Sequence, residues 1–407
     1  MGEPVSVAVQ GFNPSTFIAD ETVRLRELVR DKKVISAVSG GIDSTVATLV
    51  AREALGENLL PIMIDTGMLR LGEPERVKER LGESPTSLKV RLVHASGRFL
   101  ASVKEEVTAE EKRKKFRETF YTVLKEEALK EGCEYVVQGT IAPDWIETQG
   151  GIKTQHNVLE QIGIDSASAF GFKIIEPLAD LYKDQVRILG RHLNLPSELS
   201  QRQPFPGPGL LVRCVGRVTK EKIAVLKEVT KTVENTLAPF NYEQFFAAVI
   251  ENDFFNDASL KTIRQVAGEG LGIPVSDVHV DVFEDRVTGV KGDQRCYGRL
   301  AGVKLSEDSR ETYGWLPDRL RQLQTSIVER FSDITRVGLL VKERRARGSL
   351  SVLVRAVSTR DFMTAAVSPV PWKILKDIGQ NALKDNKKIS RVYYDITPKP
   401  PGTIEFE

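Results

Sequence analysis

The strongest constraint on the fold of this chain is a short apolar run that passes directly through a turn of small residues into a helix-forming stretch. Residues 34–38 are an apolar run typical of a buried strand, and residues 39–44 read SGGIDS. Gly40 and Gly41 allow a tight backbone path, so that successive N–H groups and the positive end of the next helix converge on one point. The pattern predicts an anion-binding turn for a phosphate group. A glycine turn with a purely structural role is the alternative.

The segments that follow alternate between strand and helix patterns. Thr108 and Glu111 form a capping box before a long amphipathic segment that stops at Gly132. Alternation at this spacing predicts an α/β fold with a doubly wound parallel sheet, in which ligands bind at the carboxyl ends of the strands. The predicted strands are residues 34–38, 59–64, 90–93 and 135–137, and the predicted helices are residues 21–30, 46–55, 73–81 and the segment after Thr108.

The second half of the chain contains a weak internal repeat. The sequence ITRV at residues 334–337 recurs as ISRV at residues 389–392, each time after an amphipathic helix and before an apolar strand. Unless the match is due to chance, we expect two similar α+β modules packed together. The Pro- and Gly-rich residues 203–209 mark the boundary before them. The expected parts are a lead-in over residues 1–20, an α/β domain over 21–209, a first module over 210–348 and a second module over 349–407.

Composition argues against several classes of partner. The chain has 58 basic and 56 acidic residues and a net charge of +2, so charge alone attracts neither nucleic acid nor a membrane surface. Its three cysteines, Cys133, Cys214 and Cys296, lie far apart and form no CxxC pair, which fits a reducing compartment and excludes a zinc-type spacing. The sequence shows no signal peptide and no long apolar run, so we expect a cytoplasmic protein without membrane spans.

The SGGIDS turn is similar to the PP-loop of the N-type ATP pyrophosphatases. It has no lysine in the position of a Walker loop, so it is not the loop that serves γ-phosphoryl transfer. The resemblance implies that the loop holds the pyrophosphate part of ATP while a substrate attacks the α-phosphate. The products of that step are an adenylylated intermediate and pyrophosphate.

Other segments resemble GMP synthetases in particular, and they occur in the same order along the chain. The resemblance implies an ATP-dependent carbon–nitrogen ligase that adenylylates XMP with ATP and Mg²⁺, adds ammonia at C2, and releases GMP, AMP and pyrophosphate. The matching segments are residues 65–70, 111–114, 138–140, 143–144, 152–153, 156–158, 176–178, 183–184, 202–210, 292–293, 361–364 and 399–405.

The resemblance also implies how the enzyme is assembled. Few residues precede the α/β domain and the three cysteines lack the surroundings of a glutaminase nucleophile, so the chain resembles the synthetase subunit that takes ammonia from a separate glutamine amidotransferase subunit. The repeat resembles the family version with an insertion in the second domain. We expect either a homodimer or an intrachain pseudo-dimer.

Site residues are carried over from the family by position. The catalytic residues implied are Asp43, Lys183 and Lys153, with Asp43 also as the Mg²⁺ ligand. The ATP contacts implied are Ser39, Gly40, Gly41, Ile42, Asp43, Ser44, Asp65 and Gly139, and the XMP contacts are Arg113, Asp293, Arg355, Lys399, Thr403 and Glu405. By residue type alone, Asp43 caps a helix, Asp65 forms a turn, and Lys183 is a solvated surface lysine.

The chain departs from the family pattern at several positions near the expected site. His94 replaces an aspartate, and Gln155 and Gln203 replace histidines. His156, in the expected lid, is by residue type an ordinary surface histidine. Two other functions therefore stay open: a different PP-loop enzyme that amidates a substrate or modifies tRNA, and a non-catalytic nucleotide-binding partner that regulates the glutaminase subunit.

Overall fold

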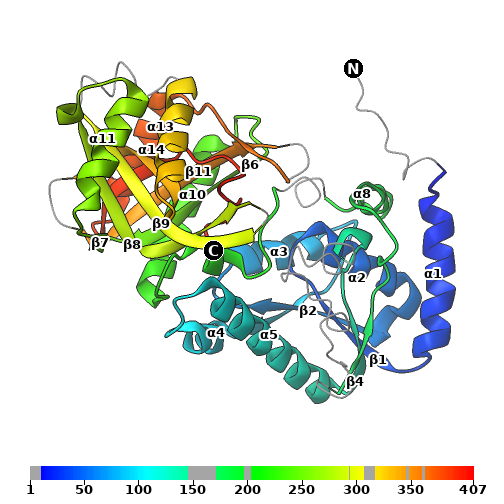
Figure 1. Ribbon diagram of the computed structural model, residues 1–407. Coiled ribbons are helices and arrows are strands. Elements are labelled where there is room, and N and C mark those ends of the chain that lie inside the picture. Colours follow the sequence, from blue (N-terminus) through cyan, green and yellow to red (C-terminus); the bar gives the residue numbers. More distant parts are fainter. Residues whose placement is uncertain are drawn as a thin grey trace. The chain divides into compact units, whose positions relative to one another are not determined.

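The computed structural model describes residues 11–144, 171–196, 203–292, 294–306, 317–344, 348–359 and 363–407 (Figure 1). The chain forms two compact units. Unit 1 contains residues 1–102 and 113–208, and unit 2 contains residues 103–112 and 209–407. The change of unit after residue 208 falls in the Pro- and Gly-rich segment. Residues 103–112, which the sequence prediction assigned to the α/β domain, pack with unit 2.

Unit 1 is built on a five-stranded sheet in the order β3-β2-β1-β4-β5, and all neighbouring strands run parallel. The prediction of a doubly wound parallel sheet is confirmed. Strand β5 was not predicted, because three residues are too few to produce a recognisable pattern. The strands are β1 (Lys33–Ala37), β2 (Leu59–Asp65), β3 (Arg91–His94), β4 (Cys133–Val137) and β5 (Lys173–Ile175).

The helices of unit 1 agree with the predictions except at the start of the chain. Helix α1 begins at Pro14, not at Glu21, and the Asn13 side chain accepts hydrogen bonds from the N–H groups of Ser15 and Thr16. The lead-in to residue 20 is therefore partly helix, since an asparagine cap followed by proline starts α1 early. The helices are α1 (Pro14–Val29), α2 (Ile42–Leu55), α3 (Glu73–Gly82), α4 (Ser96–Val103), α5 (Ala109–Glu131) and α8 (Lys183–His192).

Helix α2 is the centre of the unit 1 core. It packs against α1 and α8, and Val46, Ala47, Val50 and Ala51 have no exposed surface. The buried hydroxyls of Ser36 in β1 and Thr48 in α2 are 2.7 Å apart. Because α2 is packed on several sides, its N-terminus is held rigidly against the end of β1.

Unit 2 is built on an eight-stranded sheet in the order β12-β11-β13-β10-β9-β8-β7, with β6 paired to β11 (Figure 1). Its elements are α10 (Lys220–Leu237), β6 (Gln244–Glu251), β7 (Phe254–Phe255), α11 (Ser259–Leu271), β8 (Val278–Lys291), β9 (Gln294–Leu305), α13 (Pro317–Arg330), β10 (Ile334–Glu343), β11 (Leu350–Ser358), β12 (Ala366–Val367), α14 (Trp372–Asp385) and β13 (Ile389–Asp395). Among the helices of the described residues, none combines the length and apolarity that crossing a bilayer requires.

The internal repeat is confirmed as two β-α-β units. Strands β9 and β10 are parallel around α13, and β11 and β13 are parallel around α14. The central strands β10 and β13 are antiparallel, and Leu339 pairs with Tyr394, its equivalent in the other copy. The flanking pairs, Gly338 with Asp395 and Leu340 with Tyr393, are related by the same exchange. An approximate two-fold axis therefore passes between the two central strands.

The boundary predicted between residues 348 and 349 does not separate the two copies. Strand β6 pairs along its whole length with β11, from Gln244 with Val357 to Glu251 with Leu350. One copy, from β7 to β10, is thus inserted between β6 and β11 of the other copy. Sequence patterns describe neighbours along the chain, so they could not reveal a pairing that spans the entire insertion.

Tyr393 packs the two central strands together. Its ring lies over Gly302 in β9, where an added Cβ atom would be 2.6 Å from the ring, and its Cβ atom lies over Gly338 in β10. Gly302 and Gly338 are paired across β9 and β10. The two glycines therefore form the recess that receives the tyrosine side chain.

We predict that Gly302→Ala destabilises unit 2, because the new methyl group overlaps the Tyr393 ring. Overpacking of this kind costs about 1–3 kcal/mol. The measurement is the thermal unfolding midpoint by circular dichroism. Gly82→Ala is the matched control, because nothing lies within 4 Å of its added Cβ, and its midpoint should not fall. Equal midpoints for the two variants would contradict the packing described here.

Candidate functional site

The turn after β1 is closed by its own hydroxyl groups. The Ser39 backbone N–H donates to Ser44 Oγ at 3.0 Å, and the two serine hydroxyls are 2.8 Å apart. Thr45 Oγ1 donates to the Gly41 carbonyl at 2.8 Å. Gly40 has a φ of 79°, a left-handed conformation that favours glycine. The predicted PP-loop is therefore a rigid turn at the N-terminus of α2.

The N-terminus of α2 suits a bound anion. Its N-cap residue is Gly41, which has no side chain to accept from the N–H groups of the first turn. Such N–H groups point along the helix axis, and the helix dipole adds positive potential there. The turn lies after β1, and the sheet order reverses between β1 and β4, which is where α/β sheets open a crevice.

Gly139 brings the end of β4 against this turn. A Cβ atom at Gly139 would lie 2.5 Å from the Ser44 backbone nitrogen and 2.7 Å from the Asp43 carbonyl carbon. Only glycine allows so close an approach of two backbones. Gly139, Asp43 and Ser44, which the sequence analysis singled out separately, are therefore neighbours.

Asp43 and Lys183 form an ion pair across the crevice. Lys183, the first residue of α8, donates from Nζ to Asp43 Oδ2 at 2.5 Å. The other carboxylate oxygen, Asp43 Oδ1, is buried and has no hydrogen-bond partner among the described residues. Asp43 does not cap α2, since the cap is Gly41. The pair joins two of the predicted catalytic residues and leaves one carboxylate oxygen available.

Asp65 forms a turn at the end of β2. Its Oδ1 accepts from the Gly67 backbone N–H at 2.9 Å, and its Oδ2 lies 3.9 Å from Nδ1 of His94. His94 is exposed and is one of the departures from the family pattern. The turn-forming alternative describes what Asp65 does in the structure, while its predicted ATP contact stays a prediction.

A set of polar groups beside the β4 and β5 ends was not assigned a role from the sequence. Gln138 Nε2 donates to the Tyr121 hydroxyl at 3.3 Å, and Thr140 Oγ1 donates to Glu176 Oε1 at 2.5 Å. Burial raises the pKa of Tyr121 well above its usual range. Tyr121 lies on the buried face of the amphipathic helix α5, where its hydroxyl gives no signal that separates it from ordinary core tyrosines.

Several predicted residues lie outside the described residues. They are Lys153, Gln155, His156 and Asp293. In the part of the chain that the structure describes, no group of three or more His, Cys, Asp and Glu residues could hold a metal ion. Asp43 Oδ1 fits a magnesium ion that takes one protein carboxylate and completes its shell with phosphate oxygens and water.

The C-terminal tail, residues 396–407, is part of unit 2 and is not frayed. Ala365 and Lys399 exchange backbone hydrogen bonds of 2.9 and 2.8 Å. Strand β8 donates from the N–H groups of Val290 and Thr288 to the carbonyls of Pro401 and Phe406, at 2.6 and 2.7 Å. The tail is therefore preformed along the edge of β8.

Three buried arginines hold the tail from behind. Arg213 donates two hydrogen bonds of 2.9 Å to the Glu405 carboxylate. Arg336 donates to the Thr403 hydroxyl and carbonyl at 2.8 Å each. Arg355 has no exposed surface and donates to Asp395, to the Thr397 carbonyl and to the Thr403 carbonyl. The predicted direct contact of Arg355 with XMP needs correction, because a fully buried guanidinium bonded to the protein supports the tail instead.

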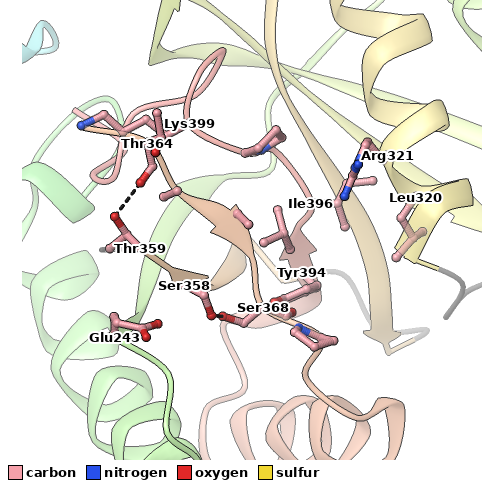
Figure 2. A pocket seen from close by; sticks show the side chains of 15 residues that line it. Glu243, Leu320, Arg321, Ser358, Thr359, Thr364, Ser368, Tyr394, Ile396 and Lys399 are labelled. Atoms are coloured by element: carbon pink, nitrogen blue, oxygen red, sulfur yellow. Dashed lines mark hydrogen bonds between the residues drawn. The ribbon is translucent and has the colours of Figure 1, made fainter. Parts of the chain in front are cut away.

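Lys399 is the tail residue that faces a cavity (Figure 2). The cavity has a volume of about 640 Å³ and is bordered by β11, β12 and the start of α13. Thr359 Oγ1 donates to the Thr364 carbonyl at 2.5 Å beside Lys399, as Figure 2 shows. Thr403 and Glu405 do not line the cavity. The predicted XMP residues of the tail thus divide into one that lines the cavity and two that contact arginines.

Arg113 lies in the first turns of α5 and is half-buried. Gln203 is also half-buried, in the segment after unit 1's last described helix. These positions agree with residues that a ligand can reach, and the predicted contact of Arg113 with XMP stays a prediction.

A lysine-free glycine turn at the switch point of a parallel sheet, with an Asp–Lys pair beside it, is typical of one class: an ATP-using enzyme of the PP-loop type. The family described as "GMP synthase C terminal domain" matches residues 319–406. The chain is 43% identical over 396 residues to the synthetase subunit of "GMP synthase [glutamine-hydrolyzing]" from Sulfurisphaera tokodaii, covering 97% of this chain and 100% of that protein. It is 38% identical over 395 residues to the protein of the same name from Methanosarcina barkeri, covering 97% and 99%.

The chain therefore belongs to the family of GMP synthase synthetase subunits, the ATP-dependent ligases that convert XMP to GMP. Among solved structures, NMN synthetase from Francisella tularensis shares 18% identity and a TM-score of 0.38, covering 49% of this chain and 78% of that one. A likeness at that level decides nothing about the site.

We predict that Gly139→Ala weakens ATP binding about tenfold or more, because its methyl group would displace the backbone of Asp43 and Ser44 and a misplacement near 1 Å is costly. The measurement is calorimetric titration of ATP without XMP. Gly97→Ala, in α4, is the control because nothing lies within 4 Å of its added Cβ. Unchanged ATP affinity in Gly139→Ala would contradict the close backbone approach.

Proposed function

We propose that this chain activates XMP by transferring AMP from ATP to the 2-oxygen, and then adds ammonia at C2 to give GMP. The observation that carries the proposal is the ion pair of Asp43 with Lys183 beside an uncapped helix N-terminus. This combination concentrates positive charge where pyrophosphate would leave. It supplies no lysine within the loop for γ-phosphoryl transfer.

The loop and Lys183 stabilise the leaving group in this proposal. The XMP oxygen attacks the α-phosphorus, and negative charge builds on the bridging oxygen of the departing pyrophosphate. The N–H groups at the start of α2 and the Lys183 ammonium are already oriented, so they stabilise that charge without rearrangement. AMP is then a good leaving group when ammonia adds to C2.

Asp43 is the residue we assign to Mg²⁺. Its Oδ1 is buried and has no partner among the described residues, while Lys183 occupies the other oxygen. When bound, the ion would neutralise charge on the pyrophosphate. Asp43 would orient it, and Lys183 would remain as the protein's own cation.

The XMP site in this proposal includes the tail. Lys399 would bind the phosphate, since it is the tail cation that lines the cavity. Thr403 and Glu405 would contact the purine from positions that Arg336 and Arg213 support. Arg113 and Asp293 complete the set by resemblance, and Lys153 belongs to a lid that excludes water.

Ammonia would come from a separate glutamine amidotransferase subunit, because the relatives' names describe a glutamine-hydrolyzing enzyme of more than one subunit. The approximate two-fold axis between β10 and β13 supports an intrachain pseudo-dimer in place of a homodimer. Chemical crosslinking tests this part, because a dimer formed on the surface of the repeat would exclude it.

The central test is an assay with purified protein, XMP, ATP, Mg²⁺ and ammonium. Phosphorus NMR should show pyrophosphate and AMP, and chromatography should show GMP. Orthophosphate with ADP would refute the proposal. ATP binding without turnover would support a regulatory nucleotide-binding protein, and turnover that depends on tRNA would support a different PP-loop enzyme.

We predict that Lys183→Met and Asp43→Asn each lower kcat about a hundredfold to a thousandfold, the range typical for loss of one group that stabilises developing charge. Each change also leaves its partner without the ion pair of 2.5 Å. The measurement is kcat for GMP formation at saturating ATP and XMP. Lys173→Met, an exposed lysine of β5, is the control and should retain the kcat of the original chain. A kcat within about twofold in Lys183→Met would exclude its assigned role.

A further inference from the structure

A lysine is fully buried at the start of α5. Lys112 has no exposed surface, and its Nζ donates to the Cys214 carbonyl at 2.9 Å and forms an ion pair with the Glu407 carboxylate. Residues 103–112 belong to unit 2, so all of these contacts lie within that unit. Burying a lysine is costly unless its charge is paired and its donors are satisfied.

Glu407 is held just as completely. Its side chain is 2% exposed, its Oε1 accepts from the Gly216 backbone N–H at 2.9 Å, and its own N–H donates to the Val212 carbonyl at 3.1 Å. Burial raises the pKa of Glu407, and Lys112 is the main group that opposes this shift. Lys112 therefore keeps a buried carboxylate charged and fixed in place.

The pair lies next to the residues assigned to XMP. Glu407 is two positions after Glu405, and the buried Phe406 between them packs edge to face on Phe246, with ring centroids 6.2 Å apart. On the other side of the pair, Lys112 directly precedes Arg113 along the chain. The position of one ion pair thus determines where the tail ends and where α5 begins.

We propose that Lys112 and Glu407 are positioning residues for XMP, which align Glu405 in the tail and the first turn of α5. This inference rests on the proposed function, because it assumes that the tail contacts XMP. A role in stability alone explains the pair poorly, since an apolar pair of similar volume usually stabilises a core as well or better. The fixed geometry of three hydrogen-bond partners, Cys214, Gly216 and Glu407, is what an apolar pair would lack.

The test measures KM for XMP and for ATP in Lys112→Met and Glu407→Gln. We expect KM for XMP to rise about tenfold or more, the cost of a misplaced contact, while KM for ATP stays within about twofold. The double variant Lys112→Met with Glu407→Met separates positioning from stability. It should recover much of the thermal midpoint lost in Lys112→Met, yet keep the raised KM for XMP.

Lys222→Met is the matched control. Lys222 is also buried, at 2% exposure, and donates to the Val215 carbonyl at 2.6 Å, but its carboxylate partner Glu251 lies in β6 and not in the tail. We expect a lower thermal midpoint with KM for XMP unchanged. Equal changes in KM for XMP in the Lys112 and Lys222 variants, or a normal KM in the double variant, would overturn the positioning role. If the original chain makes no GMP from XMP, the proposed function itself fails, which is a different result.

Discussion

The buried carboxylate of Asp395 holds the centre of the second unit together. Arg336 from β10 and Arg355 from β11 both donate to its Oδ2 at 2.7 Å, and none of the three side chains has exposed surface. Burial lowers the pKa of Arg336 to about 10, and Asp395 opposes that shift. Removing one partner from such a cluster leaves an uncompensated buried charge, so each of the three needs the others.

This cluster links the architecture to the proposed chemistry. Arg336 comes from the inserted copy of the repeat, whereas Arg355, Asp395 and the tail come from the copy that the insertion interrupts. The insertion therefore contributes a side chain that holds Thr403. A duplicated module that only filled a dimer surface would not need to contact the tail. The contact gives the second copy a role in the preparation of the site.

In unit 1 the site depends on backbone geometry more than on side chains. The turn at residues 39–44 offers N–H groups at a helix start, and Gly139 brings a second backbone against it. The side chains that add charge, Asp43 and Lys183, sit on elements that the parallel sheet brings to the same crevice. Such a site can stabilise a leaving pyrophosphate with groups that are already in place.

The PP-loop, the parallel sheet, the start of α5 and the repeat could all be predicted from the sequence alone, because each depends on residues close together in the chain. Four other features needed the folded chain: Asp43 pairs with Lys183, Arg355 is buried behind the tail, β6 joins β11, and Lys112 reaches Glu407. These contacts join residues far apart in sequence. Their partners are selected by packing and by the cost of burying charge, which no local pattern of residues records.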